Sequence, residues 1–173
     1  AFENIRRDRV LEKVERLGGL GGRSAEDSQR IEAIRAALAS AERLTAARPH
    51  PKALVILQRD PVFVVGSGGY IDELLAATGA RNLGAAFDEP YPQVAVEWLV
   101  DAGPDVLIDM TDEPGDPHAF WSRWPAIPAV AARRVLHLDP EIVTLPGPYL
   151  DRAVVSLVEA LHGRSLAMQL SRR

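Results

Sequence analysis

The first 48 residues carry apolar side chains at the spacing of a helix. A short first stripe comprises Val10, Val14 and Leu17, and the glycines within 18–22 end it. A second stripe comprises Ile31, Ile34, Leu38, Ala41 and Leu44. Ser24 is a good N-cap for this second helix, and Pro49 stops it. We therefore expect one unbroken helix over about 25–47, roughly 35 Å long at 1.5 Å per residue, which is enough to span a whole domain.

From residue 49 onward, short apolar runs alternate with helical stripes. Strands are expected at 53–57, 63–65, 105–109 and 134–138, and helices through Leu74 to Gly79, over 94–102, over 118–124 and from Pro148 to Gly163. This alternation predicts an α/β fold with a layered, mostly parallel, Rossmann-like sheet flanked by helices. We expect three parts: a helical segment over 1–48, one α/β lobe over 49–163 and a frayed tail over 164–173.

The composition is that of an ordinary globular protein, with 47% apolar and 25% charged residues in 173. The net charge of −4 argues against a nucleic-acid partner, because phosphate binders usually carry a basic face. The chain has no cysteine, which excludes disulfides and thiolate metal sites. No stretch approaches the roughly 18–20 apolar residues of a membrane span, and Ala1 does not begin a signal peptide.

Residues 82–122 contain nine acidic residues and no lysine or arginine. They are Asp88, Glu89, Glu97, Asp101, Asp105, Asp109, Asp112, Glu113 and Asp116. Such a run either lies at solvated loop tips and helix starts, or forms a face that docks on a basic partner.

A glycine turn, Gly66-Ser67-Gly68-Gly69, separates an expected strand from an expected helix. Its backbone amides could bind an anion, but the turn lacks the G-x-G-x-x-G spacing and the lysine of a P-loop, so the nucleotide interpretation is weak. A tight strand-to-helix turn is the favoured interpretation, and a third is that the turn lines a ligand cleft at the carboxyl edge of the sheet.

Histidines and carboxylates offer little evidence of a metal or catalytic site. No two of His50, His118, His137 and His162 lie at i, i+3 or i+4. Asp109, Asp112, Glu113 and Asp116 with His118 could bind a hard cation, but their spacing is not that of an EF-hand. No nucleophile-and-base motif is visible. We expect no enzyme, no metal and no cofactor.

Several short motifs, taken in order, resemble the metal-chelate class of periplasmic binding proteins, which carry vitamin B12, haem and ferric siderophores to ABC importers. The first are Leu17-Gly18 with Gly21-Gly22, residues 51–55 and residues 65–68. The next are residues 72–75, 78–80, 91–97 and 104–108. The last are residues 124–130, Arg134-Val135 and Pro146-Gly147-Pro148. Their order and spacing across the chain make the resemblance fairly specific.

The resemblance implies two α/β lobes joined by one long rigid helix, with the ligand held between the lobes. This chain matches the linking helix, at about 25–47, and the C-terminal lobe. The N-terminal lobe and a signal peptide are expected upstream, so the sequence is interpreted as a fragment of a longer protein.

The resemblance also assigns residues. Phe63, Ser67, Tyr91 and Glu141 would face the ligand cleft, and Tyr91 stands where these proteins often place a tryptophan. An aromatic ring held between prolines suits a flat apolar ligand, although it could instead cap the core beneath a loop. Tyr149 follows the Pro-Gly-Pro motif where the family often has arginine, which puts the role of that arginine in doubt.

Glu97 matches an acidic residue at the tip of the lobe that pairs with arginines of the membrane permease, a well-defined contact. The alternative is an ordinary acid in the first turn of a helix.

The function that the resemblance implies is capture of a metal chelate, a corrinoid being favoured and haem or a ferric siderophore the alternatives. The implied partner is an ABC permease, and the location is periplasmic or extracytoplasmic, with a lipid anchor as an option. Two rivals stay open: a nucleotide-using or chelatase-like α/β enzyme domain, and a lone interaction module that docks through its acidic face.

Overall fold

The computed structural model describes residues 9–12, 25–140 and 150–171. Within them, one sheet comprises β1 (Lys52–Arg59), β2 (Val62–Val64), β3 (Arg81–Asn82), β4 (Val106–Asp109) and β5 (Val135–His137). Strand β1 pairs in parallel with β3 and β4, β4 pairs in parallel with β5, and β2 is antiparallel to β1. The predicted α/β class with a mostly parallel sheet is therefore confirmed.

Strands β1 and β4 lie at the middle of the sheet because their apolar runs are buried on both faces. Residues 53–56 of β1 are fully buried and pair in register with residues 106–109 of β4. Side chains alternate across a strand, so Val55 enters the core on one face while Leu54 and Ile56 enter the core on the other. A continuous apolar run is what such a strand requires.

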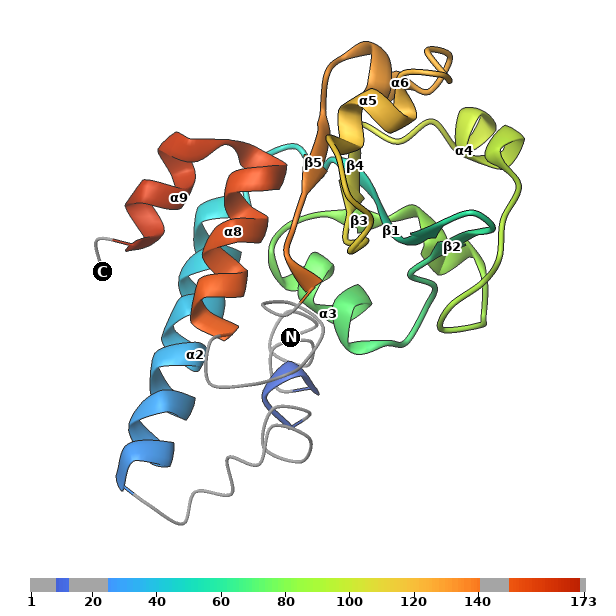
Figure 1. Ribbon diagram of the computed structural model, residues 1–173. Coiled ribbons are helices and arrows are strands. Elements are labelled where there is room, and N and C mark those ends of the chain that lie inside the picture. Colours follow the sequence, from blue (N-terminus) through green and yellow to red (C-terminus); the bar gives the residue numbers. More distant parts are fainter. Residues whose placement is uncertain (1–8, 13–24, 141–149, 172–173) are drawn as a thin grey trace.

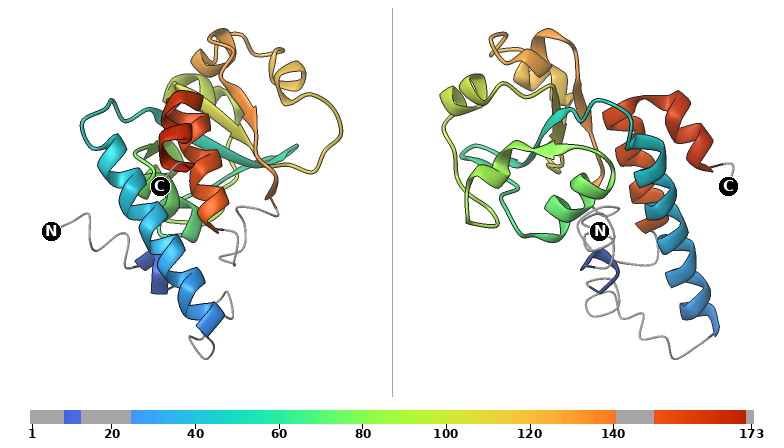
Figure 2. Two further views of the ribbon diagram at one scale, coloured as in Figure 1. Left: turned by 90° about the vertical axis from the view of Figure 1, so that its left-hand side faces the viewer. Right: turned by 180° about the vertical axis from the view of Figure 1, so that it is seen from behind.

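Helices cover both faces of this sheet (Figures 1 and 2). One core contains side chains of α2 (Ala25–Thr45), α3 (Tyr70–Ala77), α8 (Leu150–His162) and α9 (Arg164–Ser171). The opposite core contains side chains of α4 (Val96–Ala102), α5 (Pro117–Trp121) and α6 (Pro128–Ala131). A short 3-10 helix, η1 (Leu83–Ala86), follows β3. None of the helices in the described parts of the chain is long and apolar enough to cross a membrane.

Helix α2 runs without a break over 21 residues, which confirms the long helix expected near 25–47. Its C-terminal part packs on the lobe through the buried side chains of Ile34, Leu38 and Ala41. Its N-terminal part exposes Glu26 and Gln29, and Figures 1 and 2 show this end extending past the sheet. Helix α2 is therefore longer than it needs to be to cover this sheet.

The frayed tail expected over 164–173 is wrong for residues 164–171, which form α9. Gly163, at φ +91°, reverses the chain after α8, and the buried side chains of Leu166, Ala167 and Leu170 then pack into the core. The apolar stripe is only two turns long and is interrupted by polar residues, so its periodicity is weak. Tertiary packing, rather than local propensity, makes this segment helical.

Leu166→Ala should lower the free energy of unfolding by about 2–5 kcal/mol, because the side chain is 2% exposed and its removal leaves a cavity. Met168→Ala is the matched control on the same helix, since Met168 is 47% exposed, and it should change stability by less than about 0.5 kcal/mol. Urea unfolding followed by tryptophan fluorescence measures both. Equal small effects would mean that α9 does not pack as described.

Candidate functional site

The carboxyl ends of β1, β4 and β5 meet at one edge of the sheet, where open α/β sheets bind ligands. Two hollows lie at this edge. The apolar pocket, of about 230 Å³, is lined by Leu57, Val65, Gly69, Tyr70, Ile71 and Tyr91. The polar pocket, of about 500 Å³, is lined by Thr111, Asp112, Glu113, Gly115, Pro117, His137, Asp139 and Pro140. An apolar and a polar hollow at the same edge of the sheet suit a ligand that has both kinds of surface.

Of the four residues predicted to face a cleft, Tyr91 lies in the apolar pocket. Its side chain is 59% exposed, the largest value among the large apolar side chains of the described residues. Phe63 is half-buried on β2, opposite Gln58, and Ser67 is half-buried in the glycine turn, but neither lines this pocket. Glu141 lies outside the described residues. A cleft-facing role for these three residues therefore stays a prediction.

The sequence analysis missed Leu57, Val65, Tyr70 and Ile71 as pocket residues. A weak signal was available, because Leu57 closes the apolar run of β1 and Tyr70 directly follows the glycine turn. Tyr70 also has a buried hydroxyl, for which the described residues provide no hydrogen-bond partner. Burial raises the pKa of this phenol far above its usual value, so the group stays neutral.

Tyr91 belongs to a loop, residues 87–93, that is tied to the sheet on both sides of the ring. We call this segment the Tyr91 loop. The amide of Val64 donates to the Pro92 carbonyl at 3.1 Å, and the amide of Gly66 donates to the Pro90 carbonyl at 2.9 Å. A β-bridge joins Phe63 to Gln93. The exposed ring thus stands on a backbone that is fixed to β2 and to the glycine turn.

The first three amides of the glycine turn donate hydrogen bonds within the protein. Gly66 donates to Pro90, Ser67 donates to the Phe87 carbonyl at 3.2 Å, and Gly68 donates to Asp72 Oδ2 at 2.9 Å. A phosphate-binding loop needs these N–H groups free to face the anion. The arrangement therefore favours a structural turn beside the apolar pocket over the nucleotide interpretation.

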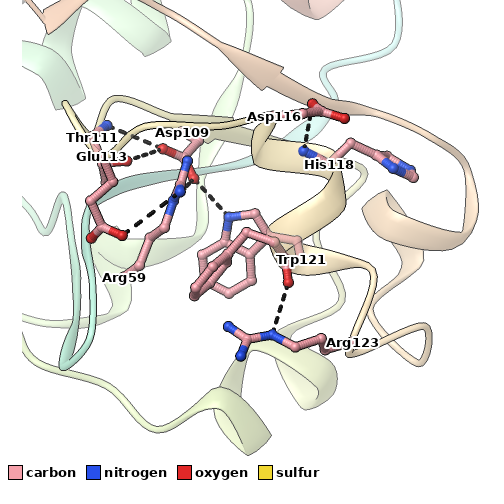
Figure 3. Close-up of polar contacts among 9 residues, drawn as sticks. Arg59, Asp109, Thr111, Glu113, Asp116, His118, Trp121 and Arg123 are labelled. Atoms are coloured by element: carbon pink, nitrogen blue, oxygen red, sulfur yellow. Dashed lines mark hydrogen bonds and ion pairs between the residues drawn. The ribbon is translucent and has the colours of Figure 1, made fainter.

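A buried ion pair joins the ends of β1 and β4 (Figure 3). Arg59 Nε donates to Asp109 Oδ2 at 2.9 Å, and the indole N–H of Trp121 donates to the same oxygen at 2.7 Å. The other oxygen, Oδ1, accepts from the hydroxyl of Thr111 at 2.7 Å and from its amide at 3.1 Å. Arg59 also lies 3.7 Å from Glu113 of the polar pocket. The network anchors the segment after β4 to the end of β1.

Asp109 is ionised in this network. Burial acts to raise the pKa of its carboxyl, but the hydrogen bonds from Arg59, Trp121 and Thr111 outweigh burial and lower the pKa below its usual value. Because its oxygens already accept four hydrogen bonds from protein groups, Asp109 is not available as a cation ligand in this arrangement.

The other members of the candidate cation site do not gather around Asp109. Asp116 caps the start of α5 by accepting from the His118 amide at 3.0 Å, and Asp112 is exposed. No group of three or more His, Asp or Glu side chains in the described residues is placed to hold a metal ion. His162 is half-buried with Nε2 at 2.9 Å from the Thr78 carbonyl, and burial lowers its pKa.

The acidic run over 82–122 contains two overlapping sets. Asp105, Asp109 and Asp116 accept hydrogen bonds from protein groups, the first from the Lys52 amide at 2.8 Å. The exposed residues of the run are Asp88, Glu89, Glu97, Asp101, Asp112, Glu113 and also Asp116. Glu97 lies in the first turn of α4, the position that the helix dipole favours for an acid, and Asp101 follows one turn later. The run is thus partly structural and partly a charged surface.

Asp109→Asn should lower the free energy of unfolding by about 3–5 kcal/mol, because the buried Arg59 charge loses its nearest carboxylate and keeps only the half-exposed Glu113, 3.7 Å away. The native contribution is present above the unfolded pKa of about 4 and is lost as pH falls through the lower folded pKa, so the difference between the proteins should shrink in acid. Urea unfolding at pH 7 and at pH 3 measures it.

Asp112→Asn is the control for that variant, because Asp112 is exposed and should change stability by less than about 0.5 kcal/mol. Equal effects of the two substitutions would contradict the buried ion pair.

Comparison with known proteins bears on the family and on the fold. Residues 2–142 match the family model described as "Periplasmic binding protein". An uncharacterised ABC transporter substrate-binding lipoprotein of Bacillus subtilis, YvrC, is 26% identical over 157 residues, covering 88% of this chain and 50% of the relative. The vitamin B12-binding protein of Vibrio parahaemolyticus is 26% identical over 104 residues, covering 60% of this chain and 38% of the relative.

Among solved structures, the periplasmic haem-binding protein BhuT in complex with two haems superposes with a TM-score of 0.65 at 26% identity. The match covers 83% of this chain and 56% of BhuT. The chain therefore spans half the length, or less, of YvrC and of the Vibrio protein, and 56% of BhuT.

Proposed function

Because the chain belongs to the periplasmic binding protein family, we propose that it supplies the linking helix and the C-terminal lobe of a solute-binding protein for an ABC importer. The observation that carries the proposal is the hollowed carboxyl edge of the lobe, where the exposed ring of Tyr91 stands over the apolar pocket. Helix α2, whose N-terminal end extends past this edge, is the proposed connection to a second lobe.

The proposed mechanism is capture and handover without chemistry. Two lobes close over a bulky ligand and bury most of its surface, and the complex then docks on the permease. Rigid linkage through α2 limits the opening compared with a flexible hinge. The occupied amides of the glycine turn do not favour the rival nucleotide-using enzyme. Capture for an importer takes place outside the cytoplasmic membrane, so the proposed location is extracytoplasmic.

The proposed ligand is a metal chelate, with a corrinoid favoured. Support comes from the Vibrio relative named as a vitamin B12-binding protein and from the flat, uncharged face that Tyr91 offers. Haem is the alternative, supported by the likeness to BhuT, and a ferric siderophore is a further member of the same ligand class. The neighbouring polar pocket would receive polar groups at the ligand's rim, such as amides or amines, because Asp112 and Glu113 line it.

The chain should bind cyanocobalamin or hemin weakly, since one lobe buries only part of such a ligand and buried contact supplies much of the affinity. Tyr91→Ser should weaken that binding by a further factor of about 2–10, equivalent to the loss of one aromatic stacking contact. Titration followed by visible absorbance, with each probe in turn, measures both.

Met168→Ser is the matched control for Tyr91→Ser, because Met168 is the other large exposed apolar residue of the described chain and lies on α9. Sub-micromolar affinity of the unmodified chain would contradict the two-lobe proposal. Equal affinities of the two variants would instead mean that Tyr91 does not contact the ligand.

Glu97 is the proposed contact with the permease. Glu97→Lys in the complete two-lobe protein should reduce its affinity for the reconstituted importer by about tenfold or more, since it replaces an attraction to arginine by repulsion. Glu32→Lys makes the same charge change on an exposed position of α2, across the molecule from α4 in Figure 1. Binding to the importer in lipid nanodiscs, with ligand affinity measured in parallel, separates docking from capture. Equal losses for both variants would refute a specific role of Glu97.

A further inference from the structure

Asn82 connects the segments that surround the glycine turn, although its side chain is only 9% exposed and does not line the apolar pocket. Its Nδ2 lies within hydrogen-bond distance of the Val65 carbonyl at 3.2 Å and of the Gly66 carbonyl at 3.1 Å. The same nitrogen donates to Asp72 Oδ1 at 2.9 Å, and its Oδ1 accepts from the Gly84 amide at 3.0 Å. One buried amide therefore ties β3 to the glycine turn, to α3 and to η1.

The opposite side of the glycine turn supports the Tyr91 loop. A Cβ atom on Gly66 would lie 1.8 Å from the Glu89 carbonyl oxygen and 2.9 Å from Pro92 Cδ, so the backbone of the loop passes directly over this glycine. The amide of Gly66 donates to Pro90, one residue before Tyr91. Any displacement of Gly66 is thus transmitted to the segment that carries the Tyr91 ring.

We infer that Asn82 is a positioning residue for ligand capture, holding the glycine turn and, through Gly66, the Tyr91 loop in the pose that the ligand meets. The part of this inference that concerns the ligand rests on the proposed function. The positioning itself is a property of the free chain. Because Asn82 is buried beneath the turn, its effect on a ligand is indirect.

The chemistry of the amide is what the position requires. Asn82 faces three acceptors with its NH2 group and one donor with its oxygen. Aspartate has the same shape but offers only acceptors when ionised, so it would repel both carbonyls and the Asp72 carboxylate. Asn82→Asp is therefore a nearly isosteric change that reverses these contacts.

The pose of Tyr91 can be observed directly in the ligand-free chain. The chain has three tyrosines, so labelling with 3-fluorotyrosine gives a simple ¹⁹F NMR spectrum in which Tyr91→Phe assigns the Tyr91 signal. Asn82→Asp should shift or split this signal. It should also speed hydrogen exchange of the Gly66 and Ser67 amides by about tenfold or more, while the Val55 amide in β1 exchanges as before.

Two further variants separate positioning from a general loss of stability. Gly66→Ala should disturb the same Tyr91 signal from the other side of the turn, because its methyl group would collide with the Glu89 carbonyl. Asp105→Ala removes an acceptor for the Lys52 amide at the opposite edge of the sheet and should leave the Tyr91 signal unchanged. If the Tyr91 signal and Gly66 exchange in Asn82→Asp match the unmodified chain, or change only in step with Val55, the inference is overturned.

Ligand affinity tests the second half of the inference, with cyanocobalamin and hemin as probes. Asn82→Asp should weaken binding by about fivefold or more relative to Asp105→Ala, because the pocket is no longer preorganised. A moved Tyr91 signal with unchanged probe affinity would overturn the role in capture. If the unmodified chain bound neither probe, the choice of ligand would fail, whereas a moved Tyr91 signal would still support the positioning role of Asn82.

Discussion

Burial of β1 on both faces is the constraint on which the rest of the lobe depends. Its four central residues are fully enclosed, so β1 must have a partner on each edge and a layer of helices on each face. Strand β4 fills one edge, while β2 and β3 share the other. That sharing brings the glycine turn, which follows β2, next to Asn82 of β3. The Tyr91 loop is thus supported because β2 and β3 pair with the same edge of β1.

The ion pair at the end of β1 is a different kind of constraint. Taking Arg59 and Asp109 out of water carries a large desolvation cost, which their attraction and the added hydrogen bonds from Trp121 and Thr111 offset. Its net contribution to stability is therefore small, but removal of one partner is costly. The pair fixes the direction in which the chain leaves β4. Asp109, the last residue of that strand, is held by hydrogen bonds from Arg59, Trp121 and Thr111.

The order of the main helices and strands could be predicted from the sequence, because each of them carries a strong local signal. The apolar run of β1, the stripe of α2 and the glycines that end α3 and α8 each identify one element. Helix α9 and strand β3 were missed for a physical reason: two turns and two residues are too short to show a period, and both form because a tertiary surface accepts them.

The candidate site was predictable to a smaller extent. Tyr91 could be singled out because a large aromatic between two prolines is unusual in a loop. Asn82 could not, since a lone asparagine beside an apolar run is a common helix cap or turn residue. Its importance depends on Val65 and Gly66, 17 and 16 residues earlier in the chain, and on a donor geometry that exists only after β1 has gathered its neighbours. Likewise, the sequence left Asp109 open as one member of a weak cation site, and its pairing with Arg59, 50 residues away, is visible only in the fold.

The same short segment links the two surfaces that the proposed function requires. After Tyr91 the chain pairs with β2 and then enters α4, which begins at Val96 and carries Glu97 in its first turn. Phe87, at the start of the Tyr91 loop, packs against Trp98 of α4 with ring centroids 5.0 Å apart. The pocket and the proposed docking helix are therefore joined by direct contacts around β1. For a protein that captures and releases a ligand, these contacts couple Tyr91 to α4, so a release movement between lobes, through α2, would carry the pocket and the docking helix together.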